Sequence, residues 1–238
     1  MKALAGVIVL TGGLIPLTAQ QGEGLAEAVR KAQEYKSYRF SVSLEITGAP
    51  EPVTVPRFEG TFEAAKGLYY AVGGEGHVAR RGDRTAVRPG GSDWETLEEV
   101  APRAPQQGFY RVILAMVRAL KPPHELIKKV EAAMARVEKT REGEEDVYSG
   151  SLTEEAARKS VIFRRELQKL QNAEVTGQLK VRVGAENRLS RVNLDQRIRG
   201  SANGQDHDVT LRWTFEFKDI DAAKSEMPPE AEKLLEEP

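Results

Sequence analysis

The residue types that most often carry catalysis or bind metal ions are sparse and scattered in this chain of 238 residues. Its three histidines stand far apart, and none has a second histidine at a metal-binding spacing such as His-x-x-x-His. The compact group Asp206-His207-Asp208 combines two carboxylates with one imidazole, a set that binds a metal ion weakly without further ligands. We interpret this group as a solvated turn at the mouth of a hairpin, and we predict no metal site.

The sequence also shows no clear site for nucleophilic or acid–base catalysis. The chain has no cysteine, which excludes a thiol nucleophile, a disulfide and a cysteine metal site, and it has no Gly-x-Ser-x-Gly motif. Acidic pairs such as Glu98-Glu99 are adjacent, so their side chains point apart instead of facing each other across a scissile bond. We therefore predict a protein that is not an enzyme and has no cofactor, and we keep an enzyme acting on lipid or glycan only as a third hypothesis.

A strict alternation of apolar and polar residues organises most of the chain. It is clearest at 209–217 and recurs at 38–46 and 179–183. A period of two is typical of strands that are buried on one face only. Several strands therefore share one apolar face, which other elements must cover.

Turn pairs and helical periodicity complete the order of elements. We expect strands at 38–48, 57–66, 67–72, 76–81, 84–88, 147–152, 174–184, 188–199 and 207–219. Helices are expected at 23–35, 94–100, 107–121, 122–138, 153–171 and 227–235, with Thr153 as an N-cap residue. The first five strands form an antiparallel meander, and the helices clustered in the middle of the chain are the expected cover of the sheet.

The N-terminus predicts export. Met1-Lys2 precedes an apolar run that ends at Leu17, and a small residue, Ala19, precedes a polar stretch. We predict a secretory signal peptide over 1–19 and a single mature domain over 20–238, which would be soluble and periplasmic or extracellular. The apolar run is shorter than the roughly 20 residues of a membrane-spanning helix, so a retained anchor is the alternative.

The overall charge indicates neither nucleic acid nor a strongly acidic partner, but one segment is basic. The formal charge is -1, from 35 Lys and Arg against 36 Asp and Glu, and no nucleic-acid signature is present. Residues 103–139 nevertheless hold eight Lys or Arg against three Glu, mostly on the two expected middle helices. This surface is either an ordinary solvated helix face or a contact for an anionic membrane surface or an envelope protein.

Three short stretches carry a resemblance to a known family. They are Gly67-Leu68-Tyr69-Tyr70, Tyr148-Ser149-Gly150-Ser151-Leu152 and Arg188-Leu189-Ser190-Arg191-Val192. With the order of elements over nearly the whole mature chain, they resemble the LolA-like superfamily of periplasmic lipoprotein carriers, including the mycobacterial lipid-binding lipoproteins LppX and LprG. The resemblance implies an α+β fold, a strongly curved antiparallel sheet (an incomplete β-barrel) with helices covering its concave apolar face. Because the chain lacks the acylated cysteine that tethers the mycobacterial relatives, the resemblance supports a soluble carrier.

The preferred hypothesis is an exported protein that binds lipid, or an acylated protein, through acyl chains held between the sheet and the helices at 107–121 and 122–138. The candidate cavity residues are the apolar residues on the shared face of the strands and those on the apolar stripes of these helices. They are Phe40, Val42, Leu44, Phe62, Tyr70, Val112, Ile113, Met116, Leu126, Val130, Trp213 and Phe215. The sequence leaves open whether they enclose a cavity or form a dry core. The alternative is an envelope interaction or sensor protein that uses the same fold as a scaffold, with the basic helices of 107–139 as its contact surface.

Overall fold

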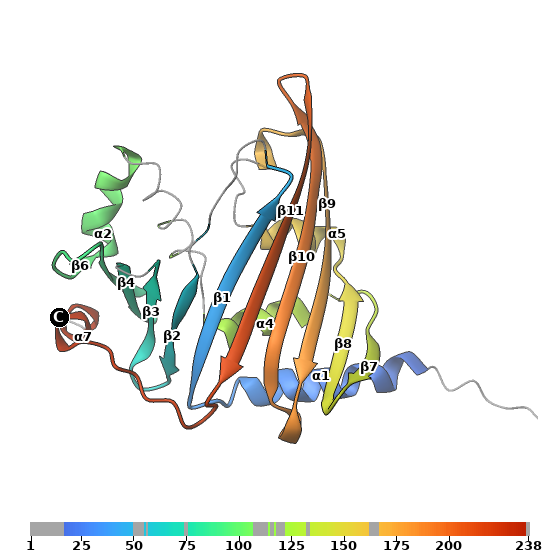
Figure 1. Cartoon of the computed structure of the whole chain (residues 1–238), viewed down its shortest axis with the longest axis horizontal. Helices are drawn as coiled ribbons and strands as arrows, with labels where there is room; N and C mark the ends of the chain where they lie inside the picture. Colours follow the sequence, from blue (N-terminus) through green and yellow to red (C-terminus); the bar gives the residue numbers. More distant parts are fainter. Residues whose placement is uncertain are drawn as a thin grey trace, which may run out of the picture.

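One open antiparallel sheet of eleven strands forms the body of the protein (Figure 1). The computed structural model describes residues 17–49, 55, 57–73, 76–106, 114, 117, 122–131, 134–161 and 167–236. The strands are β1 Ser37–Thr47, β2 Phe58–Glu63, β3 Gly67–Val72, β4 Gly76–Arg81, β5 Arg84–Arg88, β6 Glu95–Thr96, β7 Glu138–Glu142, β8 Glu145–Ser151, β9 Gln171–Val183, β10 Leu189–Ala202 and β11 Gln205–Lys218. The sheet runs from β6 at one edge to β7 at the other and is not closed into a barrel, which confirms the predicted fold class.

Two meanders meet at the centre of this sheet. The strand order is β6-β5-β4-β3-β2-β1-β11-β10-β9-β8-β7, so β1 and β11 are neighbours although they lie at opposite ends of the sequence. Their register places Val42 opposite Phe215 and Leu44 opposite Trp213, which aligns the apolar phases of the two strands on one face. The pairing of β1 with β11 therefore joins the two halves of the chain into one continuous apolar surface.

Helices cover the two faces of the sheet unequally. They are α1 Leu17–Ala32, α2 Leu97–Val100, α4 Pro123–Glu131, α5 Glu154–Ser160 and α7 Pro229–Leu235, with short 3-10 helices η1 Ala101–Gln106 and η2 Ala185–Asn187. In the view of Figure 1, α4 and α5 lie behind the strands and α1 crosses at their lower end. We call the face that α1, α4 and α5 cover the inner face. Helix α7 packs on the opposite, outer face, where Ala231 and Leu235 join a small cluster with Ala79 and Ala86.

Two glycines allow close approach on the inner face. At Gly24 of α1, a Cβ atom would lie 2.1 Å from the hydroxyl oxygen of Tyr148. At Gly60 of β2, it would lie 2.1 Å from the backbone oxygen of Tyr69. Both distances are below any real Cβ contact, so a side chain at either position would push the helix or the neighbouring strand away.

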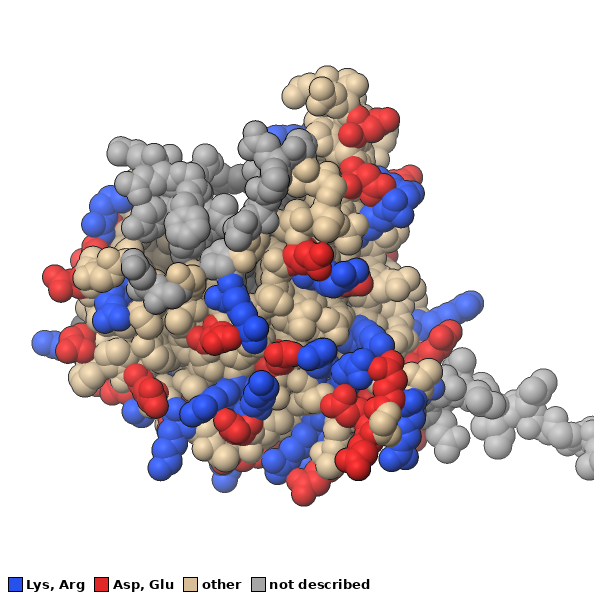
Figure 2. Space-filling model, viewed as in Figure 1, with Lys and Arg blue, Asp and Glu red and all other residues tan. Residues whose placement is uncertain are grey.

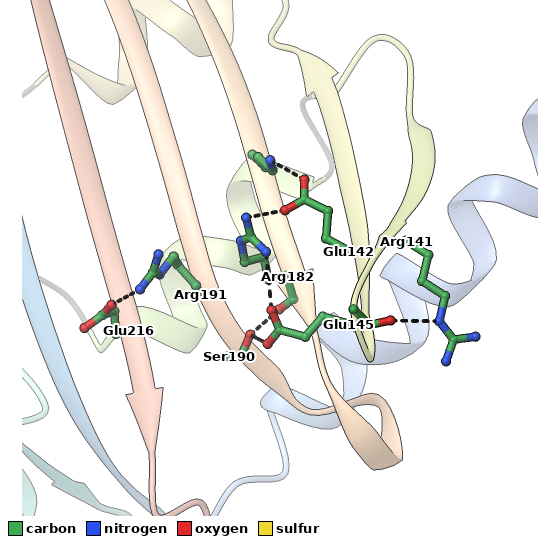
Figure 3. A network of polar contacts seen from close by, with 9 residues as sticks. Arg141, Glu142, Glu145, Arg182, Ser190, Arg191 and Glu216 are labelled. Atoms are coloured by element: carbon green, nitrogen blue, oxygen red, sulfur yellow. Dashed lines mark hydrogen bonds and ion pairs between the residues drawn. The ribbon is translucent and has the colours of Figure 1, made fainter.

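The outer face is polar and carries ion pairs that cross from strand to strand. Figure 2 shows Lys and Arg mixed with Asp and Glu over this face. Arg182 of β9 contacts Glu142 of β7 and Glu145 of β8, and Arg191 of β10 contacts Glu216 of β11 (Figure 3). An apolar inner face and a charged outer face are what the alternation of the strands predicts.

Two of the expected helices are shorter than predicted. The helix expected at 122–138 ends at Glu131, and Glu138–Glu142 is the edge strand β7, whose residues are all exposed. This segment has no apolar alternation, so its sequence carries no strand signal; it is held by pairing with β8. Of the helix expected at 153–171, α5 covers Glu154–Ser160 and is followed by the extended Val161, residues 162–166 are outside the described part, 167–168 are again helical, and β9 begins at Gln171.

The helix expected at 94–100 is also shorter than predicted, because Glu95–Thr96 form the edge strand β6 and α2 spans only Leu97–Val100. Thr153 is the N-cap of α5, where its side chain accepts a hydrogen bond from the backbone N–H of Ala156. The helix expected at 107–121 lies outside the described residues except for Leu114 and Val117, which are both helical and buried. The first helix begins at Leu17, and 1–16 are outside the described part. Among the described residues, no helix is long and apolar enough to cross a membrane.

Candidate functional site

The inner face is built from rows of apolar side chains that run across the strands. One row joins Leu44 of β1, Trp213 of β11, Leu194 of β10 and Leu179 of β9, which the register places opposite one another. All four are buried, with exposed fractions of 7% or less. The next row toward the α1 end continues into the other half of the sheet and contains Val72, Phe58, Val42, Phe215, Val192 and Val181. The inner face is therefore one apolar surface across both meanders.

Gly60 makes room for aromatic side chains in the following row. It lies between Phe40 of β1 and Tyr70 of β3 in the register. The rings of Phe40 and Tyr70 meet edge to face over it, with centroids 6.2 Å apart. A neighbouring glycine thus permits two large rings to pack where a third side chain would separate them.

Helix α4 is fixed to the sheet by a polar contact inside the apolar surface. The Tyr38 hydroxyl lies 2.8 Å from Nδ1 of His124, and the His124 ring packs against Phe62 at a centroid distance of 4.8 Å. The backbone oxygen of His124 accepts a hydrogen bond from the Gln33 side chain at 2.8 Å, just beyond the end of α1. Sheet, α1 and α4 therefore meet around Tyr38.

Burial sets the protonation of these groups. Burial lowers the pKa of His124 below its ordinary value, although the charge of Glu125 acts in the opposite direction. Burial also raises the pKa values of Tyr38 and Tyr70 well above that of an exposed tyrosine. At neutral pH all three side chains are uncharged. Among the described residues, the buried polar ones are Ser, Thr, His and Gln, with no Lys, Arg, Asp or Glu.

The structure brings together the described members of the predicted cavity set. Phe40, Val42, Leu44, Tyr70, Trp213 and Phe215 are buried in one core cluster, and Phe62 is partly buried against it. The main chain of α4 carries Leu126 and Val130, whose side chains are not described. Val112, Ile113 and Met116 lie outside the described residues. That these side chains line a cavity stays a prediction.

The sequence analysis did not identify Gln196 as a member of this surface. Gln196 lies in the inward phase of β10, between Leu194 and Ile198, and is fully buried. The sequence did contain a signal for it, because Gln196 stands where the alternation of this strand predicts an apolar residue. Tyr38 was visible as a strand residue, but its contact with His124 joins positions 86 residues apart, which alternation does not reveal.

The acidic cluster with a histidine lies at the hairpin between β10 and β11. Asp208 pairs with Arg197 and Arg199 on the neighbouring strand, so its carboxylate is already engaged. The cluster borders an open hollow of about 390 Å³ with Gln171 and Asn172. In the described part of the chain, no group of three or more His, Cys, Asp or Glu side chains is placed to hold a metal ion.

A second hollow lies on the outer face. It has a volume of about 510 Å³ and an open rim that includes Lys218 and Lys224. Small side chains such as Ser41 and Ala71 are among its lining residues. Arg57 and Glu59, which also line this hollow, form an ion pair at 2.8 Å, so part of its charge is neutralised within the hollow.

The basic segment is less uniform than the sequence indicated. Arg103 lies in η1 and pairs with Glu95, and Lys139 lies on β7 and pairs with Asp146. Lys128 and Arg136 are exposed. A partner for this surface stays a prediction.

Comparisons with known proteins add little beyond the fold. No protein-family model matches the sequence, and no curated protein matches it. Ten solved chains match the structure. One of them is a LolA superfamily protein from Nitrosomonas europaea, with 12% sequence identity and a TM-score of 0.31; the alignment covers 89% of this chain and 97% of that one. That protein belongs to the superfamily named in the sequence analysis, and the present chain itself has an open antiparallel sheet of eleven strands with α1, α4 and α5 on its inner face.

Proposed function

We propose that this protein binds the acyl chains of a lipid, or of an acylated protein, between the inner face of the sheet and its covering helices. The observation that supports the proposal is the chemistry of the inner face. It is a continuous apolar surface rich in aromatic side chains, and the described buried residues include no ionised group. A hydrocarbon chain has no polar groups, so an apolar surface of this kind is sufficient to bind it.

The cover of this face suits a binding protein. The separate helices α1, α4 and α5 lie over the inner face in place of a second sheet. The contact between Tyr38 and His124 anchors the start of α4 near the α1 end of the strands. Burial of an acyl chain at about 25 cal/mol per Å² of apolar surface would provide affinity without polar specificity.

A pair of adjacent substitutions tests the proposal. Leu44 faces inward and is 7% exposed, whereas Ser43 is exposed on the outer face of the same strand. If Leu44 borders the acyl chain, Leu44→Trp should fill that space and remove most bound lipid while the free energy of unfolding changes by less than about 1 kcal/mol. Ser43→Trp adds the same ring on the opposite face and should leave lipid binding intact.

The measurement is native mass spectrometry of residues 20–238 purified from an exporting host without detergent, followed by organic extraction. Co-purifying acyl lipid in stoichiometric amount is the expected result. A bare chain that also fails to take up offered lipids would refute the proposal. If Leu44→Trp instead lowers the free energy of unfolding by about 1–3 kcal/mol, the site is an overpacked dry core.

We also propose that the protein is exported and that its leader is removed after Ala19. Cleavage there would shorten α1, which begins at Leu17, by its first residues only. The product would have lost Lys2, so its formal charge would be one unit more negative than that of the full chain. Expression in an exporting host followed by intact-mass measurement should give a chain beginning at Gln20; a mass that includes the leader would contradict the proposal.

A further inference from the structure

A single buried amide interrupts the apolar inner face. Gln196 of β10 has no exposed surface. The register places it opposite Gly177 of β9 and Leu211 of β11, and its strand neighbours on the same face are Leu194 and Ile198. An apolar residue of similar length would satisfy packing here, so the amide needs a separate explanation.

The nitrogen of the Gln196 side chain forms hydrogen bonds with helix α5. The Nε2 group of Gln196 donates hydrogen bonds to the backbone oxygen of Ala157 at 3.1 Å and to the Ser160 hydroxyl at 2.9 Å. The Ala157 oxygen also accepts a hydrogen bond from the Ser160 hydroxyl at 2.9 Å, whereas the N–H of Val161 turns to Arg158. The nitrogen of Gln196 thus anchors the end of α5 to the sheet.

The oxygen of the Gln196 side chain makes no such contact. The Oε1 atom of Gln196 is buried and has no hydrogen-bond partner in the described part of the structure. Four other buried polar atoms lack a hydrogen bond there, namely Thr61 Oγ1, Arg88 Nε, Ser225 Oγ and Glu232 Oε1, although Glu232 Oε1 forms an ion pair with Lys66 at 3.1 Å. Thr61 and Arg88 face outward, whereas Ser225 and Glu232 lie in the C-terminal segment and α7. Of these five atoms, Gln196 Oε1 alone belongs to the inner face.

We propose that Gln196 Oε1 accepts a hydrogen bond from a neutral donor group on the bound lipid, a hydroxyl or an amide N–H. This inference rests on the proposed function and deepens it. An unpartnered amide oxygen in an apolar surface favours a ligand that brings a donor over a ligand that brings only hydrocarbon, ester or ether groups. The preferred ligand class is therefore a lipid with a hydroxyl or amide donor beside its acyl chain.

Two probes test the inference: they share the hexadecyl chain, and one has a methyl group where the other has the donor hydrogen. Hexadecan-1-ol can donate a hydrogen bond, whereas hexadecyl methyl ether has the same chain and no donor. Titration of residues 20–238 with each probe, followed by native mass spectrometry, should show that the wild type binds the alcohol at least about fivefold more tightly. In Gln196→Met the two affinities should agree within about twofold.

Ser160→Ala is the matched control. It removes one partner of Gln196 Nε2 and leaves Oε1 untouched. It should therefore keep the preference for the alcohol even if α5 is less firmly attached. A Gln196 that only anchors α5 would make both variants weaken the two probes alike.

The outcomes separate the two proposals. If the wild type binds both probes equally well, the role of Gln196 Oε1 is wrong while the proposed function stands. Retention of the preference for the alcohol in Gln196→Met also contradicts that role. If the wild type binds neither probe and carries no lipid, the proposed function fails and this inference fails with it.

Discussion

The hydroxyl of Tyr38 on β1 lies 2.8 Å from Nδ1 of His124 at the start of α4. Both side chains are buried, and the His124 ring also meets the Tyr38 ring edge to face at a centroid distance of 5.8 Å. The contact places one neutral hydrogen-bonded pair between the sheet and a covering helix. The attachment of α4 to the sheet is therefore sensitive to the protonation of His124.

Acidification should destabilise this attachment. Burial lowers the pKa of His124, so the unfolded chain takes up the proton at a higher pH than the folded protein does. The stabilisation from neutral His124 is fully present above the ordinary histidine pKa of about 6.5 and is lost as the pH falls through that value toward the lowered one. Chemical unfolding at several pH values between 7.5 and 5 should show a steeper loss for the wild type than for His124→Gln. Parallel curves for the two proteins would contradict this role of His124.

Two glycines of α1 should respond oppositely to the same substitution. A Cβ atom at Gly22 would meet nothing within 4 Å, so Gly22→Ala should raise the free energy of unfolding by up to about 1 kcal/mol through helix propensity. At Gly24 the methyl group would meet the hydroxyl of the buried Tyr148, so Gly24→Ala should lower the free energy of unfolding by about 1–3 kcal/mol. Urea titration measures both effects. The double variant with Tyr148→Phe should recover part of the loss, and no recovery would mean that another contact is responsible.

Gly60→Ala should damage the sheet itself. The added methyl group would collide with the backbone oxygen of Tyr69, which cannot move without separating β2 from β3. We expect a loss of about 2–3 kcal/mol in the free energy of unfolding. Gly76→Ala in β4, on the other side of β3, is the control, because its Cβ would lie 3.2 Å from the Val72 oxygen and needs only a small adjustment. Equal losses at the two positions would show that the conformational preference of glycine, and not the close approach, sets the cost.

The ion pairs of the outer face should contribute modestly and should depend on salt. Arg182 is 23% exposed and lies between Glu142 and Glu145, whereas Arg212 is 52% exposed beside Asp195 and Glu45. Arg182→Met should lower the free energy of unfolding by about 1 kcal/mol in low salt and by less in high salt. Arg212→Met should have a smaller effect because water already screens its partners. Denaturant titration of both variants at two salt concentrations tests this order, and a larger effect at Arg212 would reverse the interpretation.

The strands could be predicted from the sequence where every second residue is apolar and buried. The phase of β1 and β11 follows directly from their sequences, and the structure places Val42, Leu44, Trp213 and Phe215 on the inner face as expected. The same signal was present at Gln196, where a polar residue occupies an apolar phase. Strand β7 gave no such signal because none of its residues is buried. The end of α5 at Ser160 was also not predicted, since the sequence continues to favour a helix there, whereas Val161 is extended and buried.

The sequence by itself determined which residues avoid water, because alternation with a period of two is a local property of each strand. It thereby set the fold class and the apolar character of one face. Only the tertiary structure decided which strands became neighbours: β1 pairs with β11 across most of the chain, and this pairing merges two meanders into one surface. It also decided that Tyr38 meets His124 and that Gln196 uses its nitrogen on α5 while its oxygen stays free of a partner in the described structure. Such contacts depend on how distant segments pack together, which no local pattern of residues encodes.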